Sequence, residues 1–158
     1  RGRMRYSKVD LAYCAGIIDG EGSIYLGKRV PGRRRKSFYY EATVAVTMTN
    51  RAALKLLSKV FGGKVRTAKA VTVVHKKIYG WRRYAQNAEN AIKRLLPYLH
   101  VKKRQAKLAL KFREHIKRKA KNFKNGQTLQ GKTLSKADLR VREAFYIQSR
   151  KLNKRGPI

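Results

Sequence analysis

The sequence predicts an α+β domain in which a twisted antiparallel sheet carries its helices on one face. Residues 38–49 alternate strictly, so that one side of this strand is aliphatic and the other is short or polar. The aliphatic side consists of Ala42, Val44, Val46 and Met48. Stretches with apolar residues at helical spacing lie on both sides of the strand. Hydrophobic residues make up 42% of the chain, which is enough for a core despite its high charge.

The predicted elements follow the order helix, hairpin, helix, hairpin, helix, with further helices after them. The first helix begins after Ser7, which forms a capping box with Asp10. It ends near Asp19, before Gly20 and Gly22, because glycines stop helices. The other elements expected are strands 23–29 and 38–49, helix 51–61, strands 64–74 and 78–85, a helix from 87 that Pro97 ends or bends, and helix 101–119. We expect one domain over 1–158, with a core of about 7–119, a basic turn at 30–36, a basic linker at 120–134 and a C-terminal helix at about 135–152.

The charge balance indicates a nucleic-acid partner. The chain has 41 Lys plus Arg against 8 Asp plus Glu, a formal net charge of +33. No membrane partner is expected, because the apolar run 11–18 is well short of the roughly 18 residues that span a bilayer. No signal-peptide pattern is present either. The single Cys14 forms no intrachain disulfide, so we expect an intracellular, reducing compartment (cytoplasm, nucleoid or an organelle).

Acidic residues are scarce, yet three of the eight lie close together. Asp10, Asp19 and Glu21 stand in or beside the apolar segment that ends in glycines. Carboxylates at this point repel phosphate, which is a cost in a protein that attracts polyanions. A divalent cation between carboxylate and phosphate removes this cost.

Residues 14–22, with the sequence CAGIIDGEG, resemble the LAGLIDADG motif of homing endonucleases. The segment departs from the motif at Cys14, where the motif has leucine, and at Gly20, where it has alanine. Residues 95–106 also resemble a stretch that the family carries after its second hairpin. The resemblance covers roughly residues 7–116. It implies the αββαββα homing-endonuclease fold with a saddle-shaped sheet.

The resemblance implies a site-specific, divalent-metal-dependent DNA endonuclease, encoded in an intron or similar insertion, that cuts both strands of alleles lacking it. In the family the last acid of the motif is a metal ligand, which corresponds to Glu21, and the Gly20 carbonyl lies beside it. We expect Mg²⁺ as the cofactor, with Mn²⁺ as an alternative and Ca²⁺ binding without supporting cleavage. Lys102 corresponds to the family's basic residue near the active site. Asn50 corresponds to a polar residue that orders water, and equally to the N-cap of the next helix.

Only one copy of the motif is present, so the resemblance implies a homodimer that reads a pseudo-palindromic site. Ala12, Gly16 and Gly20 recur every fourth residue, and small side chains there let two helices approach closely. The same residues also fit a crowded core within one chain. The dimer interface is assigned to Ala12, Ala15, Gly16 and Asp19, of which Asp19 has a structural rather than a metal-binding role.

The solvated face of the sheet is expected to bind double-stranded DNA. The facing of strand 38–49 is clear, whereas the register of residues 64–85 is ambiguous. The candidate residues on the strands are Tyr25, Arg29, Glu41, Thr43, Thr47, Arg66, Trp81 and Arg83. The candidate phosphate contacts in the turn are Arg33, Arg34, Arg35 and Lys36.

Two other functions stay open. One is an RNA-binding intron maturase on the same fold, and the other is a basic structural RNA-binding protein in which the motif is coincidental. The second gives no reason for acids at a glycine-flanked helix end. Glu21 together with Lys102 favours the nuclease over the maturase.

Overall fold

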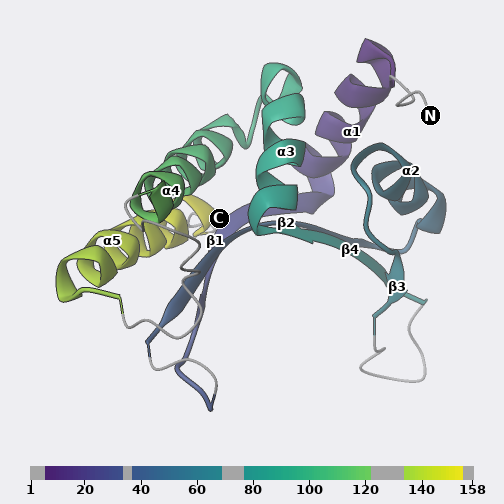
Figure 1. Ribbon diagram of the computed structural model, residues 1–158. Helices are drawn as coiled ribbons and strands as arrows, with labels where there is room; N and C mark the ends of the chain where they lie inside the picture. Colours follow the sequence, from purple (N-terminus) through teal and green to yellow (C-terminus); the bar gives the residue numbers. More distant parts are fainter. Residues whose placement is uncertain (1–5, 34–36, 69–76, 122–133, 155–158) are drawn as a thin grey trace.

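The computed structural model describes residues 6–33, 37–68, 77–121 and 134–154. In these residues an antiparallel sheet with strand order β1-β2-β4-β3 carries helices on one face (Figure 1). The elements are α1 (Lys8–Glu21), β1 (Gly22–Arg29), β2 (Tyr39–Met48), α2 (Arg51–Phe61), β3 (Arg66–Thr67), β4 (Tyr79–Tyr84), α3 (Ala85–Leu95), η1 (Leu96–Tyr98), α4 (Lys103–Lys121) and α5 (Lys136–Asn153). The α+β class and the αββαββα order are confirmed.

Helix α1 begins at the predicted capping box. The Ser7 hydroxyl accepts the Asp10 N–H at 3.1 Å, and the Asp10 carboxylate accepts the Ser7 N–H at 3.0 Å. The helix runs past Asp19 to Glu21 and passes directly into β1. A Cβ at Gly22 would lie 2.9 Å from the Cα and from the carbonyl oxygen of Ile18. Glycine is therefore needed where helix and strand meet.

The core lies between the sheet and the helices. On the covered face, β2 is flanked by β1 and β4, and Val44 and Val46 are buried as the alternation predicts. Helix α1 contributes Cys14, Ala15 and Ile18 to this core. From one end of the sheet to the other, Figure 1 shows α4 and α5, then α3 and α1, and finally α2. Burial of these apolar side chains is the main source of stability.

A buried ion cluster joins α3 to α4. Glu89 is 3% exposed and its carboxylate lies 2.7 Å from Lys93 Nζ, 3.1 Å from Arg113 Nε and 2.5 Å from Lys117 Nζ. Burial acts to raise the pKa of Glu89, but the hydrogen bonds from these three cations outweigh it and lower the pKa to about 2. The carboxylate is therefore ionised at neutral pH and fully paired.

Helix α5 covers the outer edge of β1. The Ser149 hydroxyl accepts the Leu26 N–H at 2.9 Å, and the Asn153 amide donates to the Ile24 carbonyl at 3.1 Å. These bonds satisfy edge groups of the strand that no neighbouring strand pairs.

Some predicted bounds differ from the structure. The strand expected at 64–74 is reduced to Arg66–Thr67, and residues 69–76 lie outside the described residues. Helix α3 begins at Ala85, two residues before the predicted start. The reason is that β4 turns into α3 at Ala85, whose φ is 47°, without a side-chain cap that the sequence could signal. Within the predicted linker, residues 122–133 lie outside the described part.

Candidate active site and nucleic-acid interface

Glu21 is the last residue of α1 and is exposed to solvent. Six of the eight acids bind groups of the chain, namely Asp10, Asp19, Glu41, Glu89, Asp138 and Glu143. Within the described residues, Glu21 and Glu114 have no hydrogen bond or ion pair. A strongly cationic chain thus leaves a carboxylate unpaired at the end of its glycine-containing helix.

Lys102 stands just before α4 and reaches back to the end of α1. Its Nζ donates to the carbonyl oxygen of Asp19 at 2.5 Å, two residues before Glu21. The fold therefore brings the predicted Lys102 to the helix end that carries the predicted Glu21. A cation here also stabilises the unpaired carbonyls at the C-terminal end of α1.

The Asp19 side chain binds the backbone of its own chain. Its Oδ2 accepts the His100 N–H at 2.7 Å and its Oδ1 accepts the Lys102 N–H at 2.9 Å. Burial acts to raise the pKa of Asp19, but these backbone hydrogen bonds and the Lys102 charge lower it below the ordinary value. The carboxylate is used within its own chain, which agrees with the predicted structural role, and its place at a dimer interface stays a prediction.

Asn50 caps α2. Its Oδ1 accepts the N–H groups of Ala52 at 3.0 Å and of Ala53 at 3.2 Å. Of the two readings of this residue, the N-cap is the one observed. Its oxygen is consequently occupied, and the ordering of water by Asn50 stays a prediction.

The residues predicted to form the dimer interface lie on two different sides of α1. Ala12, Gly16 and Gly20 are exposed, whereas Ala15 is fully buried in the core. Ala15 was therefore misassigned, because it follows the inward stripe of the helix. A Cβ added at Gly16 or at Gly20 would meet no atom within 4 Å. Nothing in the described chain requires glycine at either position.

Large apolar side chains border this outer side of α1. Val9 is 76% exposed and Tyr13 is 58% exposed. Exposed apolar side chains beside a run of small residues are typical of a surface that packs against another helix.

The open face of the sheet carries most of the predicted strand residues. Strand pairing places them on the side away from the helices: Tyr25, Arg29, Glu41, Thr43, Thr47 and Arg66. Their accessibility varies. Thr47 is exposed, whereas Thr43 is 1% exposed because Tyr25 and Tyr84 lie next to it in the pairing. The Glu41 carboxylate lies 2.6 Å from Arg29 NH2, which also limits direct contact by Glu41.

Trp81 and Arg83 lie on the covered face, so their assignment to the DNA-binding face was wrong. Trp81 pairs with Val46, is fully buried, and donates from Nε1 to the Gly62 carbonyl at 2.8 Å. Arg83 packs so closely that a Cβ at Gly63 would lie 3.0 Å from its Cδ.

Arg82 and Tyr84 occupy the open face instead and were missed. The ambiguous register of β4 caused the error, because a shift by one residue exchanges the two faces of a strand. The general preference of tryptophan for burial was the available signal.

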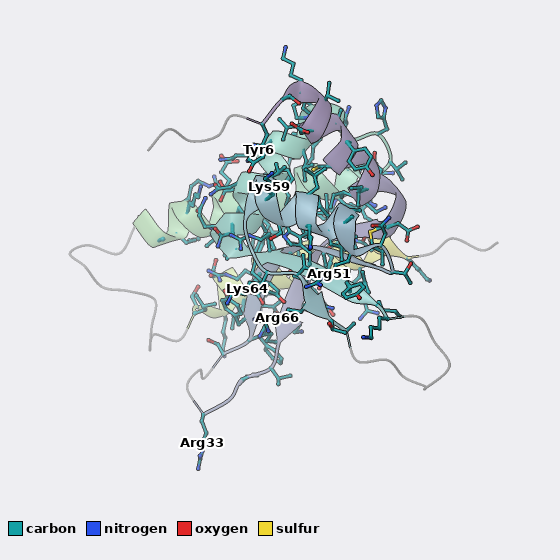
Figure 2. All side chains as sticks on the ribbon, turned by 90° about the vertical axis from the view of Figure 1, so that its right-hand side faces the viewer. Tyr6, Arg33, Arg51, Lys59, Lys64 and Arg66 are labelled. Carbon is teal, nitrogen blue, oxygen red and sulfur yellow. The ribbon has the colours of Figure 1, made fainter. Side chains whose placement is uncertain are left out.

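Basic residues continue beyond the strands. Arg33 lies at the far end of the β1–β2 hairpin and points away from the helices, while Lys64 and Arg66 lie next to each other below α2 (Figure 2). Arg34, Arg35 and Lys36 fall outside the described residues.

The predicted metal donors of the chain are few. Among the described residues no group of three or more His, Cys, Asp or Glu could hold a metal ion. The predicted donors, the Glu21 carboxylate and the Gly20 carbonyl, are both oxygens, which suits a hard cation such as Mg²⁺ rather than Zn²⁺. The donors therefore fit the implied ion in kind.

No helix in the described part of the chain has the length and apolar character needed to cross a membrane.

Solved structures share this fold. The homing endonuclease I-CvuI, in complex with its target in the presence of Ca, is 18% identical with a TM-score of 0.71, over 95% of this chain and 87% of that chain. The archaeal intron-encoded homing endonuclease I-Vdi141I, complexed with DNA, is 16% identical with a TM-score of 0.69, over 94% of this chain and 87% of that chain.

A longer protein matches over part of its length. The LAGLIDADG meganuclease I-CpaMI, bound to uncleaved DNA, is 17% identical with a TM-score of 0.58, over 98% of this chain and 52% of that chain. No family model and no curated protein matches the sequence. These likenesses establish the fold, which is that of LAGLIDADG homing endonucleases.

Proposed function

We propose that this chain is a LAGLIDADG homing endonuclease, a divalent-metal-dependent enzyme that cuts both strands of DNA at a specific site as a homodimer. One observation carries the proposal. The exposed Glu21, unpaired within the described chain, ends a helix whose outer side is made of small residues, and the Lys102 ammonium is bound two residues before it. The LAGLIDADG-like segment and the fold add independent support.

Each of the site residues has a separate role in the proposed phosphodiester hydrolysis. Glu21 and the Gly20 carbonyl would hold Mg²⁺ or Mn²⁺, and such an ion polarises a phosphate oxygen and lowers the pKa of a bound water. The Lys102 ammonium supplies a fixed positive charge for the negative charge that develops on the phosphate during hydrolysis. Asn50 is exposed near the end of β2 and keeps its amide nitrogen for water.

Two features support the homodimer. Glycine inside a helix costs about 1 kcal/mol relative to alanine, and neither Gly16 nor Gly20 has a reason within the described chain. Close approach of a second α1 supplies that reason and brings a second Glu21 to the first. The chain also matches about half of I-CpaMI, which supports a single chain acting as one half of a two-part enzyme.

The open face of the sheet supports binding of double-stranded DNA. Arg29, Arg66 and Arg82 present guanidinium groups there, and Thr47 is accessible beside Gly80. Arginine reads guanine in the major groove through two hydrogen bonds, whereas the net charge of +33 contributes sequence-independent attraction to phosphate.

The proposal is tested by incubating the protein with duplex fragments of candidate host genes that lack an insertion, with Mg²⁺ or Ca²⁺, and by sequencing new ends. We expect a unique double-strand cut that needs Mg²⁺. Glu21→Gln should abolish the cut and retain binding, whereas Glu114→Gln, the matched change at the other acid that lacks a partner within the described residues, should cut normally. Salt-sensitive binding without a cut would overturn the nuclease and favour the maturase, for which structured intron RNA is the next probe.

A further inference from the structure

The end of α1 and the start of α4 exchange hydrogen bonds in both directions. The Asp19 carboxylate accepts the N–H groups of His100 and Lys102 at 2.7 and 2.9 Å. In return, the Lys102 ammonium donates to the Asp19 carbonyl at 2.5 Å. The Lys102 carbonyl accepts the Ala106 N–H at 3.0 Å and so begins the hydrogen bonding of α4. Each residue therefore caps the helix end that belongs to the other.

The arrangement is electrostatically complementary. The start of a helix has unpaired N–H groups and a partial positive charge, which the Asp19 carboxylate neutralises. The end of a helix has unpaired carbonyls and a partial negative charge, which the Lys102 ammonium neutralises. Both charges thus lie where the helix ends favour them.

Packing does not hold the segment that carries Lys102. Leu99 is fully buried, but His100 is exposed and Val101 is 70% exposed. Between Leu99 and the first turn of α4, the Asp19 carboxylate binds two backbone N–H groups, those of His100 and Lys102. Lys102 is itself partly exposed, and its ammonium donates a hydrogen bond to the Asp19 carbonyl.

We propose that Asp19 is a positioning residue, whose carboxylate holds the backbone of Lys102 so that the ammonium stays on the Asp19 carbonyl, at the end of α1 that also carries Glu21. Its effect on cleavage rests on the proposed function, whereas its effect on the backbone does not. The motif thereby uses its two acids differently: one orients the basic residue and the other faces the substrate.

The test uses Asp19→Asn, which keeps the shape of the side chain but loses the charge and one acceptor. Asp10→Asn is the matched control, because Asp10 also lies on α1 and accepts a backbone N–H within a helix cap. Each variant is measured for amide hydrogen exchange at residues 100 and 102, for thermal unfolding, for DNA affinity in Ca²⁺, and for single-turnover cleavage of the recovered site in Mg²⁺.

In Asp19→Asn we expect exchange at residues 100 and 102 to rise at least about tenfold, the effect of losing a charge-assisted hydrogen bond. Cleavage should fall roughly 10- to 100-fold, with affinity in Ca²⁺ within about twofold of the unchanged protein. Asp10→Asn should lower the unfolding temperature without changing either readout. Unchanged exchange at both amides in Asp19→Asn would overturn the proposal.

A double-mutant cycle separates positioning from a general structural effect. If Asp19 acts through Lys102, then Asp19→Asn adds no further loss of cleavage rate to Lys102→Met. Full additivity of the two losses would refute action through Lys102. If the unchanged protein cuts no DNA, the proposed function fails, and amide exchange still decides whether Asp19 holds this backbone.

Discussion

The junction between α3 and α4 differs from the outer side of α1 in how its residues are used within the chain. At the junction, the buried Glu89 is matched by three cations. On α1, Glu21 is exposed and unpaired within the described chain, and Gly16 and Gly20 face empty space. Of the eight acids, Glu21 and Glu114 have no partner within the described residues, and only Glu21 stands at the end of a helix with unexplained glycines. The combination of an unpaired acid and two unexplained glycines on one helix supports the proposed contact of this helix with a second chain and with DNA.

The largest effect is expected when the exposed carboxylate of Glu21 is neutralised. Glu21→Gln should reduce the cleavage rate roughly a thousandfold, because a metal ligand supports several kcal/mol of charge stabilisation. The free energy of unfolding should change by no more than about 0.5 kcal/mol, since no contact in the described chain is lost. Urea unfolding beside a single-turnover assay checks both. A clear loss of stability would place Glu21 with the fold instead.

The opposite result is expected at the junction. Glu89→Gln leaves three cations close together without their counter-charge and should lower the free energy of unfolding by about 3–5 kcal/mol. Cleavage by the folded fraction should be nearly unchanged at low temperature. Stability equal to that of the unchanged protein would show that the cluster is dispensable.

The paired Glu89 should also make the stability of the protein depend on pH. The pKa of Glu89 is about 2 when folded, against 4.5 for an ordinary glutamate, so the folded state favours the ionised form. The resulting stabilisation, about 3 kcal/mol, is complete above pH 4.5 and is lost as the pH falls toward 2. Unfolding free energies measured across this range should fall steeply in the unchanged protein and less in Glu89→Gln. Parallel curves would contradict the pairing.

The smallest effects are expected from substitutions at Gly22 and Gly16. Gly22→Ala should destabilise the chain by about 1–3 kcal/mol, because the new Cβ would lie 2.9 Å from backbone atoms of Ile18. Gly16→Leu should leave the unfolding of the monomer almost unchanged but shift the protein from dimer to monomer in sedimentation equilibrium. A dimer that survives Gly16→Leu would move the subunit interface away from α1.

Local sequence patterns predicted the features that depend on neighbouring residues. The capping box at Ser7 and the alternation of β2 are short-range, and both appear as expected. The facing of Trp81 depends on how β4 pairs with β2, a register that its own residues do not determine.

The missed parts of the candidate site come from distant contacts. Asp19 binds groups 81 and 83 residues away, and no local signal announces such partners. Ala15 was misassigned because small residues occupy both sides of α1, and only the packed structure separates the inward from the outward ones. The resemblance to the motif was enough to name Glu21 and Lys102 as candidate site residues. It gave no indication that the Asp19 carboxylate binds the backbone at residues 100 and 102.

The cover that α5 gives to β1 has a consequence for synthesis of the chain. The edge groups of Ile24 and Leu26 are satisfied by residues 129 and 123 positions later. Until α5 has been made, the nascent sheet exposes a bare strand edge to other nascent chains, and such edges promote aggregation. We therefore expect the yield of soluble protein to fall when substitutions at Ser149 and Asn153 remove the two bonds from α5 to this edge.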